Sequence, residues 1–360
     1  MKYNWSKLIS ILLLPGIFVF CGKGQQSQIH EKLLVQGIAV DFDDNEYNVH
    51  VQSHDFKNPE NKDQPSIKNT DVTGQTLSLA LGKLKKVTGL TPLYSQNLIV
   101  LVGEEAAKKG LDKFLDFFVR YYENRLSVNL RVTKGKAKEF FDAKDNDKLI
   151  KAATIKGLAN ENADINILNF ERDLKSDISD PVMLCMEKDE HEKIICKNLA
   201  VFSNDKLSSF LDKEETIGAQ ILRNVSKIGI FDVNDYEKNL SCTIESAKTE
   251  INAIMQENRP MFEINSKISV NILEFNEEFK DVKKINEKIK PIIEQKAHKI
   301  CETAIKKTLI SKCDIFKFGK ILRNKYPKYF KNIEKNWKSY LPVLKCKLKI
   351  QVDISVIGTG

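Results

Sequence analysis

The chain is poor in the residues that build metal and redox sites. Seven cysteines and five histidines are spread through 360 residues, and no two cysteines form a C-x-x-C pair. Zinc sites and disulfide scaffolds need such residues at short, regular spacings. The histidines, at positions 30, 50, 54, 191 and 298, form no recognisable ligand set. We therefore expect no bound metal ion and no cofactor.

Catalytic motifs are missing as well. The sequence contains no G-x-S-x-G and no glycine-rich dinucleotide or triphosphate loop. His191-Glu192 lacks the second histidine that a zinc protease carries on the same helix face. Neighbouring acids such as Glu104-Glu105 and Glu214-Glu215 lie in strongly charged stretches, which is not typical of an acid–base pair. We therefore expect a protein without enzymatic activity.

The N-terminus carries an uncharged run that is short for a membrane span. Leu8 to Phe20 follows Lys2 and Lys7, contains Pro15 and Gly16, and ends at Cys21. A spanning helix needs about 17 to 25 apolar residues. The pattern predicts a signal peptide over residues 1–20 and lipid attachment at Cys21. Phe20 stands where bacterial lipoproteins carry a small residue, so an uncleaved signal anchor and a secretory peptide cut elsewhere remain alternatives.

Acidic residues are scarce in one late segment. The formal net charge is +8, and from Phe316 to Lys349 there are eleven Lys or Arg against one acid, Glu334. Such a segment suits anionic lipid headgroups, cell-wall polyanions or an acidic protein partner. A solvated face with no partner is the alternative. Export of the chain excludes nucleic acid as a partner.

The first part of the chain alternates strands and helices. Leu33–Val40 and Tyr47–Val51 flank an acidic turn and predict a β-hairpin. That turn has calcium-loop spacing only in part, because Glu46 stands where such a loop needs glycine. Residues 56–73 are polar and predict a surface loop. Helices are then expected at 76–87, 104–109 and 111–122, and strands at 98–102 and 126–132.

A second hairpin is expected within Pro181–Phe202. It places Cys185 and Cys196 on neighbouring strands. They either form a disulfide in an oxidising compartment or remain two buried thiols.

The last third has the clearest periodicity. Residues 262–272 and 344–356 alternate apolar with polar side chains, as strands with one buried face do. Between them, apolar residues from Phe279 to Ala304 keep a helical spacing, with a kink expected at Pro291. These patterns predict an α+β fold of consecutive mixed α/β domains, the last with a long helix packed on a largely antiparallel sheet. We expect an N-terminal domain at 21–198, a middle domain at 199–258 and a C-terminal domain at 259–360.

Several distinctive segments are spread over nearly the whole chain after Cys21. They are Gln36–Asp41, Gly74–Leu81, Val102–Leu111, Leu115–Arg120, Ala200–Leu207 with Glu215–Gly218, and Cys313–Gly319 followed by Lys325–Lys328 and Asn336–Trp337. In this order they resemble the Ger(x)C family of spore germination lipoproteins.

This resemblance implies a function. It implies the non-catalytic C subunit of a nutrient germinant receptor, anchored by lipid to the outer face of the spore inner membrane. Such a subunit works in complex with two integral-membrane subunits, A and B. The rival hypothesis is an exported, lipid-anchored solute-binding protein that feeds a transporter. Proteins of that kind have two lobes of βα repeats, whereas this chain ends in alternating strands around a long helix.

The late motif and the basic segment together form a candidate partner interface. Its residues are Asp314, Phe316, Phe318, Gly319, Lys325, Tyr326, Lys328, Lys331, Lys335 and Trp337. A purely structural role is the alternative for the motif. In that reading Asp314 caps a helix, the two phenylalanines pack, Gly319 permits a tight turn, and Pro327 ends or restarts a helix.

Overall fold

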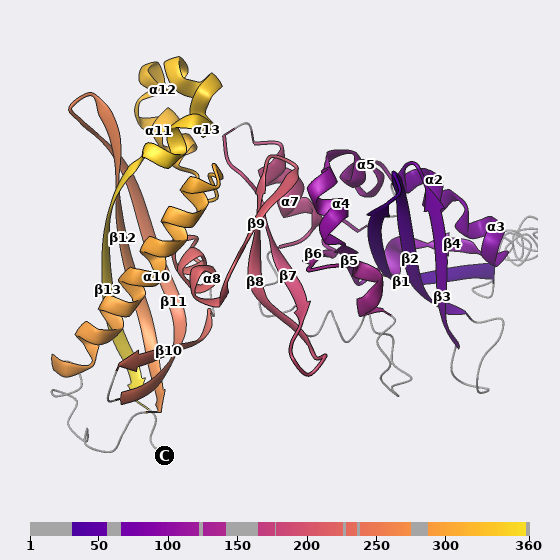
Figure 1. The fold of residues 1–360 in the computed structure, drawn as a ribbon, viewed down its shortest axis with the longest axis horizontal. Helices are drawn as coiled ribbons and strands as arrows, with labels where there is room; N and C mark the ends of the chain where they lie inside the picture. The colour runs from indigo at the N-terminus through magenta and orange to yellow at the C-terminus, as the bar shows by residue number, and fades with distance from the viewer. Residues whose placement is uncertain are drawn as a thin grey trace, which may run out of the picture.

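The computed structural model shows two β-sheets that follow one another along the chain (Figure 1). It describes residues 31–55, 66–121, 125–141, 165–176, 178–225, 228–235, 238–274 and 287–357. Cys21 and the predicted signal peptide lie outside these residues. Within them, no helix combines the length and the apolar character that crossing a bilayer requires.

The first sheet has nine strands and mixed directions. Its order is β3-β2-β1-β5-β6-β7-β8-β9, with the short β4 paired to the start of β1. The strands are β1 Lys32–Asp43, β2 Glu46–Asp55, β3 Ser66–Gly74, β4 Thr91–Leu93, β5 Ile99–Val102, β6 Asn129–Thr133, β7 Val182–Lys188, β8 Ile194–Ser203 and β9 Lys206–Leu211. Both predicted hairpins are confirmed, as β1–β2 and β7–β8.

Strand β3 corrects the predicted loop at 56–73. Residues 66–74 pair antiparallel with β2, while 56–65 lie outside the described residues. The strand is the outermost of its sheet, and its buried residues alternate with exposed ones, so one of its faces is buried. Thr70 and Val72 point inward, and the side chains between them are polar. An edge strand of this kind carries too few apolar residues to show a period of two.

Short helices pack against the first sheet. They are α2 Leu77–Gly82, α3 Leu84–Thr88, α4 Glu104–Lys109, α5 Asp112–Arg120 and α7 Ile167–Leu174, with 3-10 turns η2 Tyr94–Gln96 and η3 Ala137–Phe140. The predicted helix at 76–87 is two helices that meet at Lys83, and Thr76 caps the first through the backbone N–H of Leu79. The apolar face predicted for 111–122 is confirmed, since Phe114, Leu115 and Phe118 are buried on α5.

The second sheet has four strands in the order β10-β11-β12-β13. They are β10 Gly229–Asp235, β11 Lys238–Gln256, β12 Arg259–Glu274 and β13 Lys345–Ile357. The first two pairings are antiparallel, whereas β12 and β13 run parallel. A parallel pair needs a long crossover connection, and the helices between β12 and β13 provide it. The alternation predicted for the last two strands is confirmed: Phe262, Ile264 and Val352 face the core.

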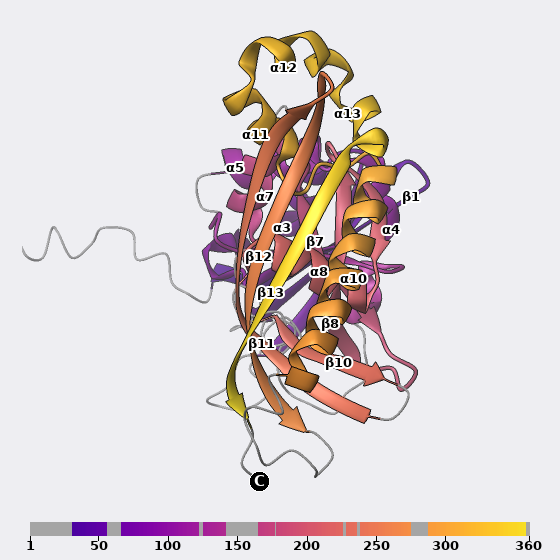
Figure 2. The same cartoon turned by 90° about the vertical axis from the view of Figure 1, so that its left-hand side faces the viewer.

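Helix α10, Lys290–Ile310, lies along the inner face of this sheet next to α8, Lys213–Leu222 (Figure 1). The expected kink at Pro291 is wrong. The proline lies in the first turn of α10, where its missing N–H costs nothing. The predicted stripe is confirmed at Ile289, Ala297, Ile300 and Ala304, whereas Ile293 is buried in place of the predicted Ile292, which is half-buried. Residues 279–286 lie outside the described residues. Figure 2 looks onto the opposite face of the sheet.

The expected middle domain contributes to both sheets. Residues 199–211 belong to β8 and β9, and β11 pairs with β12 in the second sheet. Helix α8 joins the two parts and crosses α10 closely at Gly218. A Cβ at that position would lie 2.4 Å from the Ile300 carbonyl oxygen. The division into three domains stays a prediction.

The six cysteines among the described residues are free thiols. The register opposes Cys185 to Asn198 rather than to Cys196, so the disulfide alternative is wrong. Burial raises the pKa of Cys185 to about 12. The thiol therefore stays protonated and unreactive at neutral pH.

Candidate docking surface

A group of short helices, residues 318–343, stands at one end of the second sheet between α10 and β13 (Figures 1 and 2). We call it the helical cap. It comprises α11 Phe318–Lys325, α12 Pro327–Ile333, η5 Glu334–Asn336, α13 Trp337–Tyr340 and η6 Leu341–Val343. Pro327 begins α12, as the structural reading of the motif predicts.

Asp314 holds the start of the helical cap. Its carboxylate accepts hydrogen bonds from the backbone N–H of Phe318 at 2.8 Å and of Gly319 at 2.7 Å. The same carboxylate accepts a third, at 3.1 Å, from the indole Nε1 of Trp337. The side chain is fully buried. One carboxylate therefore caps α11 and ties it to α13.

Gly319 is required by close packing rather than by a tight turn, which corrects the prediction. It lies inside α11, and a Cβ there would be 2.2 Å from Cγ2 of Ile178 and 2.7 Å from Nε1 of Trp337. The aromatic residues of the motif pack as expected. The ring of Phe318 lies 4.6 Å from that of Phe262 and 5.6 Å from that of Phe316.

Asp180 links the helical cap to the first sheet. The backbone N–H of Asp314 donates to the Asp180 carboxylate at 2.8 Å, and the Asp180 N–H donates back to the Asp314 carbonyl at 3.1 Å. The same carboxylate accepts from the Asn204 N–H at 2.8 Å and from Lys338 Nζ at 2.7 Å. Lys338 Nζ also donates to Ser203 Oγ at 2.9 Å. Two buried aspartates thus fasten α13 and α11 to the end of β8.

Burial sets the electrostatics of this link. Desolvation raises the pKa of Asp314 to about 6, although the three hydrogen bonds oppose the shift and the neighbouring Asp180 charge adds to it. A carboxylate with few compensating charges favours its neutral form when it leaves water. The link therefore responds to mild acidification.

The predicted interface residues separate into an inner and an outer set. Asp314, Phe316, Phe318, Gly319 and Trp337 are buried, and the side chains of the aspartate and the three aromatic residues are at most 5% exposed. Their positions match the structural reading and leave no surface for a partner. Lys325, Lys328, Lys331 and Lys335 are exposed, as expected, and Tyr326 is half-buried.

Most cations of the helical cap have no acidic partner. Lys317, next to its first residue, pairs with Asp173 at 3.3 Å, and Lys338 pairs with Asp180. Within the described ranges, no ion pair is formed by the others, which are Lys320, Arg323, Lys325, Lys328, Lys331 and Lys335. The helical cap therefore presents uncompensated positive charge to solvent.

Sequence reasoning missed an apolar margin next to this charge. Ile310 and Val343 are each 72% exposed and Tyr340 is 36% exposed. Ile310 ends α10, Tyr340 ends α13 and Val343 ends η6. The turn η6 contacts both helices, so the three residues belong to adjoining elements. Ile310 ends α10 at a position that does not continue the buried helical spacing. This apolar residue outside the stripe was the sequence signal that could have predicted an exposed apolar side chain. Exposed apolar side chains beside cations are typical of interfaces.

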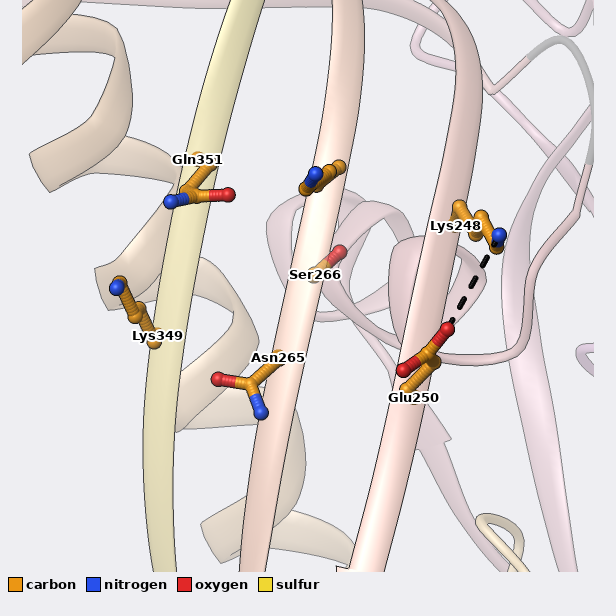
Figure 3. Close-up of a pocket in the computed structure, with 7 residues that line it drawn as sticks. Lys248, Glu250, Asn265, Ser266, Lys349 and Gln351 are labelled. Carbon is orange, nitrogen blue, oxygen red and sulfur yellow. Dashed lines mark ion pairs between the residues drawn. The ribbon is translucent and has the colours of Figure 1, made fainter.

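The basic segment is also divided in space. Lys345, Lys347 and Lys349 belong to β13 and point to the outer face of the second sheet rather than to the helical cap. Figure 3 shows this face, where Lys349 and Gln351 of β13 lie next to Asn265 of β12, and Lys248 and Glu250 of β11 lie on the other side of β12. The hollow there is lined by polar and charged residues. In the part of the chain that the structure describes, no three His, Cys, Asp or Glu side chains are grouped to hold a metal ion.

Comparisons with known proteins match both parts of the chain. The model described as "Spore germination protein N-terminal domain" matches residues 25–188, and the model described as "Spore germination B3/ GerAC like, C-terminal" matches residues 197–360. The chain belongs to the Ger(x)C family of spore germination proteins. "Spore germination protein B3" of Bacillus subtilis (strain 168) is 22% identical over 365 residues, covering 95% of this chain and 96% of the relative. The crystal structure of the GerBC protein has the same fold, with a TM-score of 0.59 at 18% identity over 88% of this chain and 96% of that one.

The Ger(x)C motifs of the first sheet also meet one another. Asp41, from the first motif, accepts hydrogen bonds from the N–H of Ala137 at 2.7 Å and of Lys138 at 3.0 Å. Gly103, from the third motif, lies against it, and a Cβ there would be 2.0 Å from Asp41 Oδ1. Asp41 is therefore held by backbone N–H groups of the segment that begins η3.

Proposed function

We propose that this protein is the non-catalytic C subunit of a nutrient germinant receptor, and that its helical cap docks onto an acidic surface of an integral-membrane subunit. Membership of the Ger(x)C family links the chain to spore germination. The observation that carries the docking proposal is the row of exposed cations without acidic partners on the helical cap. A long-range positive field of this kind attracts and orients an acidic partner.

A protein partner suits the helical cap better than a lipid surface. Ile310 and Val343 add apolar area to the cations, which a protein interface needs at its centre. The start of β1, to which a tether from Cys21 leads, lies at the opposite end of the molecule's long axis (Figure 1). Glu31 is the tenth residue after Cys21. Ten residues span at most about 35 Å, so the tether holds the first sheet, rather than the helical cap, near the membrane.

The anchor and the location belong to the same proposal. We propose that Cys21 carries lipid and that the subunit sits on the outer face of the spore inner membrane with the A and B subunits. The solute-binding alternative has no specific observation in its favour, because the family models cover both parts of the chain.

The test is a charge-removing variant of the helical cap. Changing Lys325, Lys328, Lys331 and Lys335 to Gln leaves the core untouched, because all four side chains are exposed. An exposed ion pair contributes about 0.2–1 kcal/mol, so four together contribute on the order of 1–4 kcal/mol to assembly. We expect reduced recovery of the variant with the membrane subunits, and slower germination.

The matched control removes the same charge from the outer face of the second sheet. Lys248, Lys267, Lys347 and Lys349 are also exposed, and changing them to Gln leaves the helical cap intact. We expect normal assembly and germination for this control. If the cap variant folds, associates and germinates like wild type, the docking proposal is wrong. If both variants lose assembly equally, the effect is one of net charge and the helical cap has no special part.

A further inference from the structure

A second charged feature lies at the other side of α11, where a pocket opens between α8, β11 and the segment that leads into the helical cap. Its volume is about 380 Å³, within the range of roughly 300–1,000 Å³ that small-molecule sites occupy. Its polar lining includes Arg223, Lys317, Lys320 and Asn324, and its apolar lining includes Ile251 and Ile321. Lys325, Lys328, Lys331 and Lys335, the four lysines of the docking test, do not line the pocket, which shares Lys320 with the exposed cations of the helical cap.

Arg223 is the central feature of this pocket. It is the C-cap residue of α8, and its side chain is partly buried. One guanidinium nitrogen, Nη1, donates to the Ile315 carbonyl oxygen at 2.7 Å, and among the described residues no carboxylate lies within ion-pair distance. Desolvation lowers the pKa of Arg223, and Asp173 opposes the shift from a distance. A guanidinium has five N–H donors, so most of its hydrogen-bonding capacity remains for a ligand.

The rest of the pocket adds positive charge rather than neutralising it. Lys317 pairs with Asp173, which among the described residues is also the acid that acts on Arg223. Lys320 is exposed at the mouth and has no ion pair within the described chain. Three cations therefore face one carboxylate. Charges that leave water are normally matched by an opposite charge, which this pocket does not supply from its own residues.

The apolar lining restricts the class of ligand. Ile251 of β11 and Ile321 of α11 are half-buried and line the same space as the cations. A hydrated inorganic ion gains nothing from such side chains, whereas a ring or an alkyl group is desolvated by them. Asn224 does not compete for the ligand, because its side-chain amide is already bonded to Thr249. Its Nδ2 donates to the Thr249 carbonyl oxygen, and its Oδ1 accepts from the Thr249 N–H.

We propose that this pocket binds a small organic anion, with its carboxylate or phosphate on Arg223 and Lys320 and its apolar group against Ile251 and Ile321. This site goes beyond the proposed receptor function and does not depend on it. The ligand contacts α8, β11 and α11 together, and the pocket-lining residues Ile315 to Lys317 follow Asp314 directly. Binding therefore stabilises the seat of the helical cap.

The probe is phenyl phosphate, which carries both chemical features, and the comparison ligands are inorganic phosphate and neutral benzyl alcohol. Binding is measured by isothermal titration calorimetry on the purified protein. Arg223→Gln removes the partly buried cation, Lys320→Gln removes the exposed one, and Lys331→Gln is the matched control on the helical cap outside the pocket. We expect phenyl phosphate to bind more tightly than inorganic phosphate and benzyl alcohol not to bind measurably.

Arg223→Gln removes a charge-assisted hydrogen bond and should weaken the affinity for phenyl phosphate about tenfold or more. Lys320→Gln removes an exposed charge and should weaken it about threefold. Lys331→Gln should bind like wild type. Arg223→Gln also loses its bond to Ile315, so its fold is checked by circular dichroism. Lys320→Gln keeps the test decisive if Arg223→Gln does not fold. The proposal is overturned if wild type does not bind phenyl phosphate at millimolar concentration, if phosphate binds equally well, or if Lys320→Gln and Lys331→Gln behave alike.

Discussion

Replacing Asp314 by asparagine tests the link that seats the helical cap. The substitution keeps the shape of the side chain but removes its charge and converts one acceptor oxygen into an NH2 donor. In the folded protein both Asp314 oxygens accept hydrogen bonds, from the N–H groups of Phe318 and Gly319 and from Trp337. The asparagine amide cannot satisfy all three donors.

The cost follows from burial. Asp314 is fully buried, so a donor that loses its acceptor has no water to replace it. Each unsatisfied buried group costs about 1–3 kcal/mol, and at least one of the three donors is left without an acceptor. We expect Asp314→Asn to lower the free energy of unfolding by about 2–4 kcal/mol at neutral pH, measured by urea denaturation.

The pH dependence gives a second, independent signature. The pKa of Asp314 rises from its ordinary value of 3.8 to about 6 in the folded protein. The folded state therefore binds this proton more tightly than the unfolded state. The stability that the group contributes is complete below about pH 4 and is lost as the pH rises through about 6. About 1 kcal/mol of it appears between pH 7 and pH 5, so the gap between wild type and Asp314→Asn should widen by that amount on acidification.

The control is Asp353→Asn on the outer end of β13. The Asp353 side chain is 79% exposed and lies 3.9 Å from Lys290, so its loss should change stability by less than about 0.5 kcal/mol. The reasoning is refuted if Asp314→Asn unfolds at the same urea concentration as wild type. A gap that narrows as the pH falls would refute the assigned direction of the pKa shift.

Three further predictions concern packing, the link and the anchor. Gly218→Ala should lower the free energy of unfolding by about 1–3 kcal/mol, because the added Cβ meets the Ile300 carbonyl oxygen. The control is Gly82→Ala, whose Cβ meets nothing within 4 Å and should leave stability unchanged. Equal effects of the two substitutions would contradict the packing argument. Lys338→Met removes the Nζ that donates to the Asp180 carboxylate and should lower the free energy of unfolding by about 2 kcal/mol in the same assay. A change near zero would show that water takes the place of the lysine. Cys21→Ala should release much of the protein from membranes, since stable anchoring needs more than one acyl chain; mass spectrometry that finds an unmodified Cys21 would rule out the lipid.

Local periodicity explains which elements could be predicted. The hairpin β1–β2, helix α4 and the apolar face of α5 each repeat a single pattern, and all three are confirmed. Strand β11 was not predicted although it has 19 residues. Register shifts at Ser241/Cys242 and Ile244/Ser246 interrupt its pairing with β12. Each such irregularity moves the following side chains out of phase, which hides a period of two.

Long-range links were beyond the sequence. The sequence predicted that Asp314 caps the helix that follows it, and the hydrogen bond from the Phe318 N–H to its carboxylate confirms this. Its bond to Asp180 joins residues 134 positions apart and left no local pattern. The exposed lysines of the helical cap could be predicted from charge, whereas the pocket around Arg223 arises from three segments that meet only in the folded chain.

Site-specific cross-linking tests the docking proposal most directly. A photoreactive amino acid at position 331 places the probe on the helical cap, and the same amino acid at position 267 places it on the outer face of the second sheet; both native lysines are exposed. The account predicts that, in spore membranes, the probe at 331 forms adducts with an integral-membrane subunit and that the probe at 267 does not. Adducts only with lipid from position 331, or protein adducts from 267 alone, would contradict it.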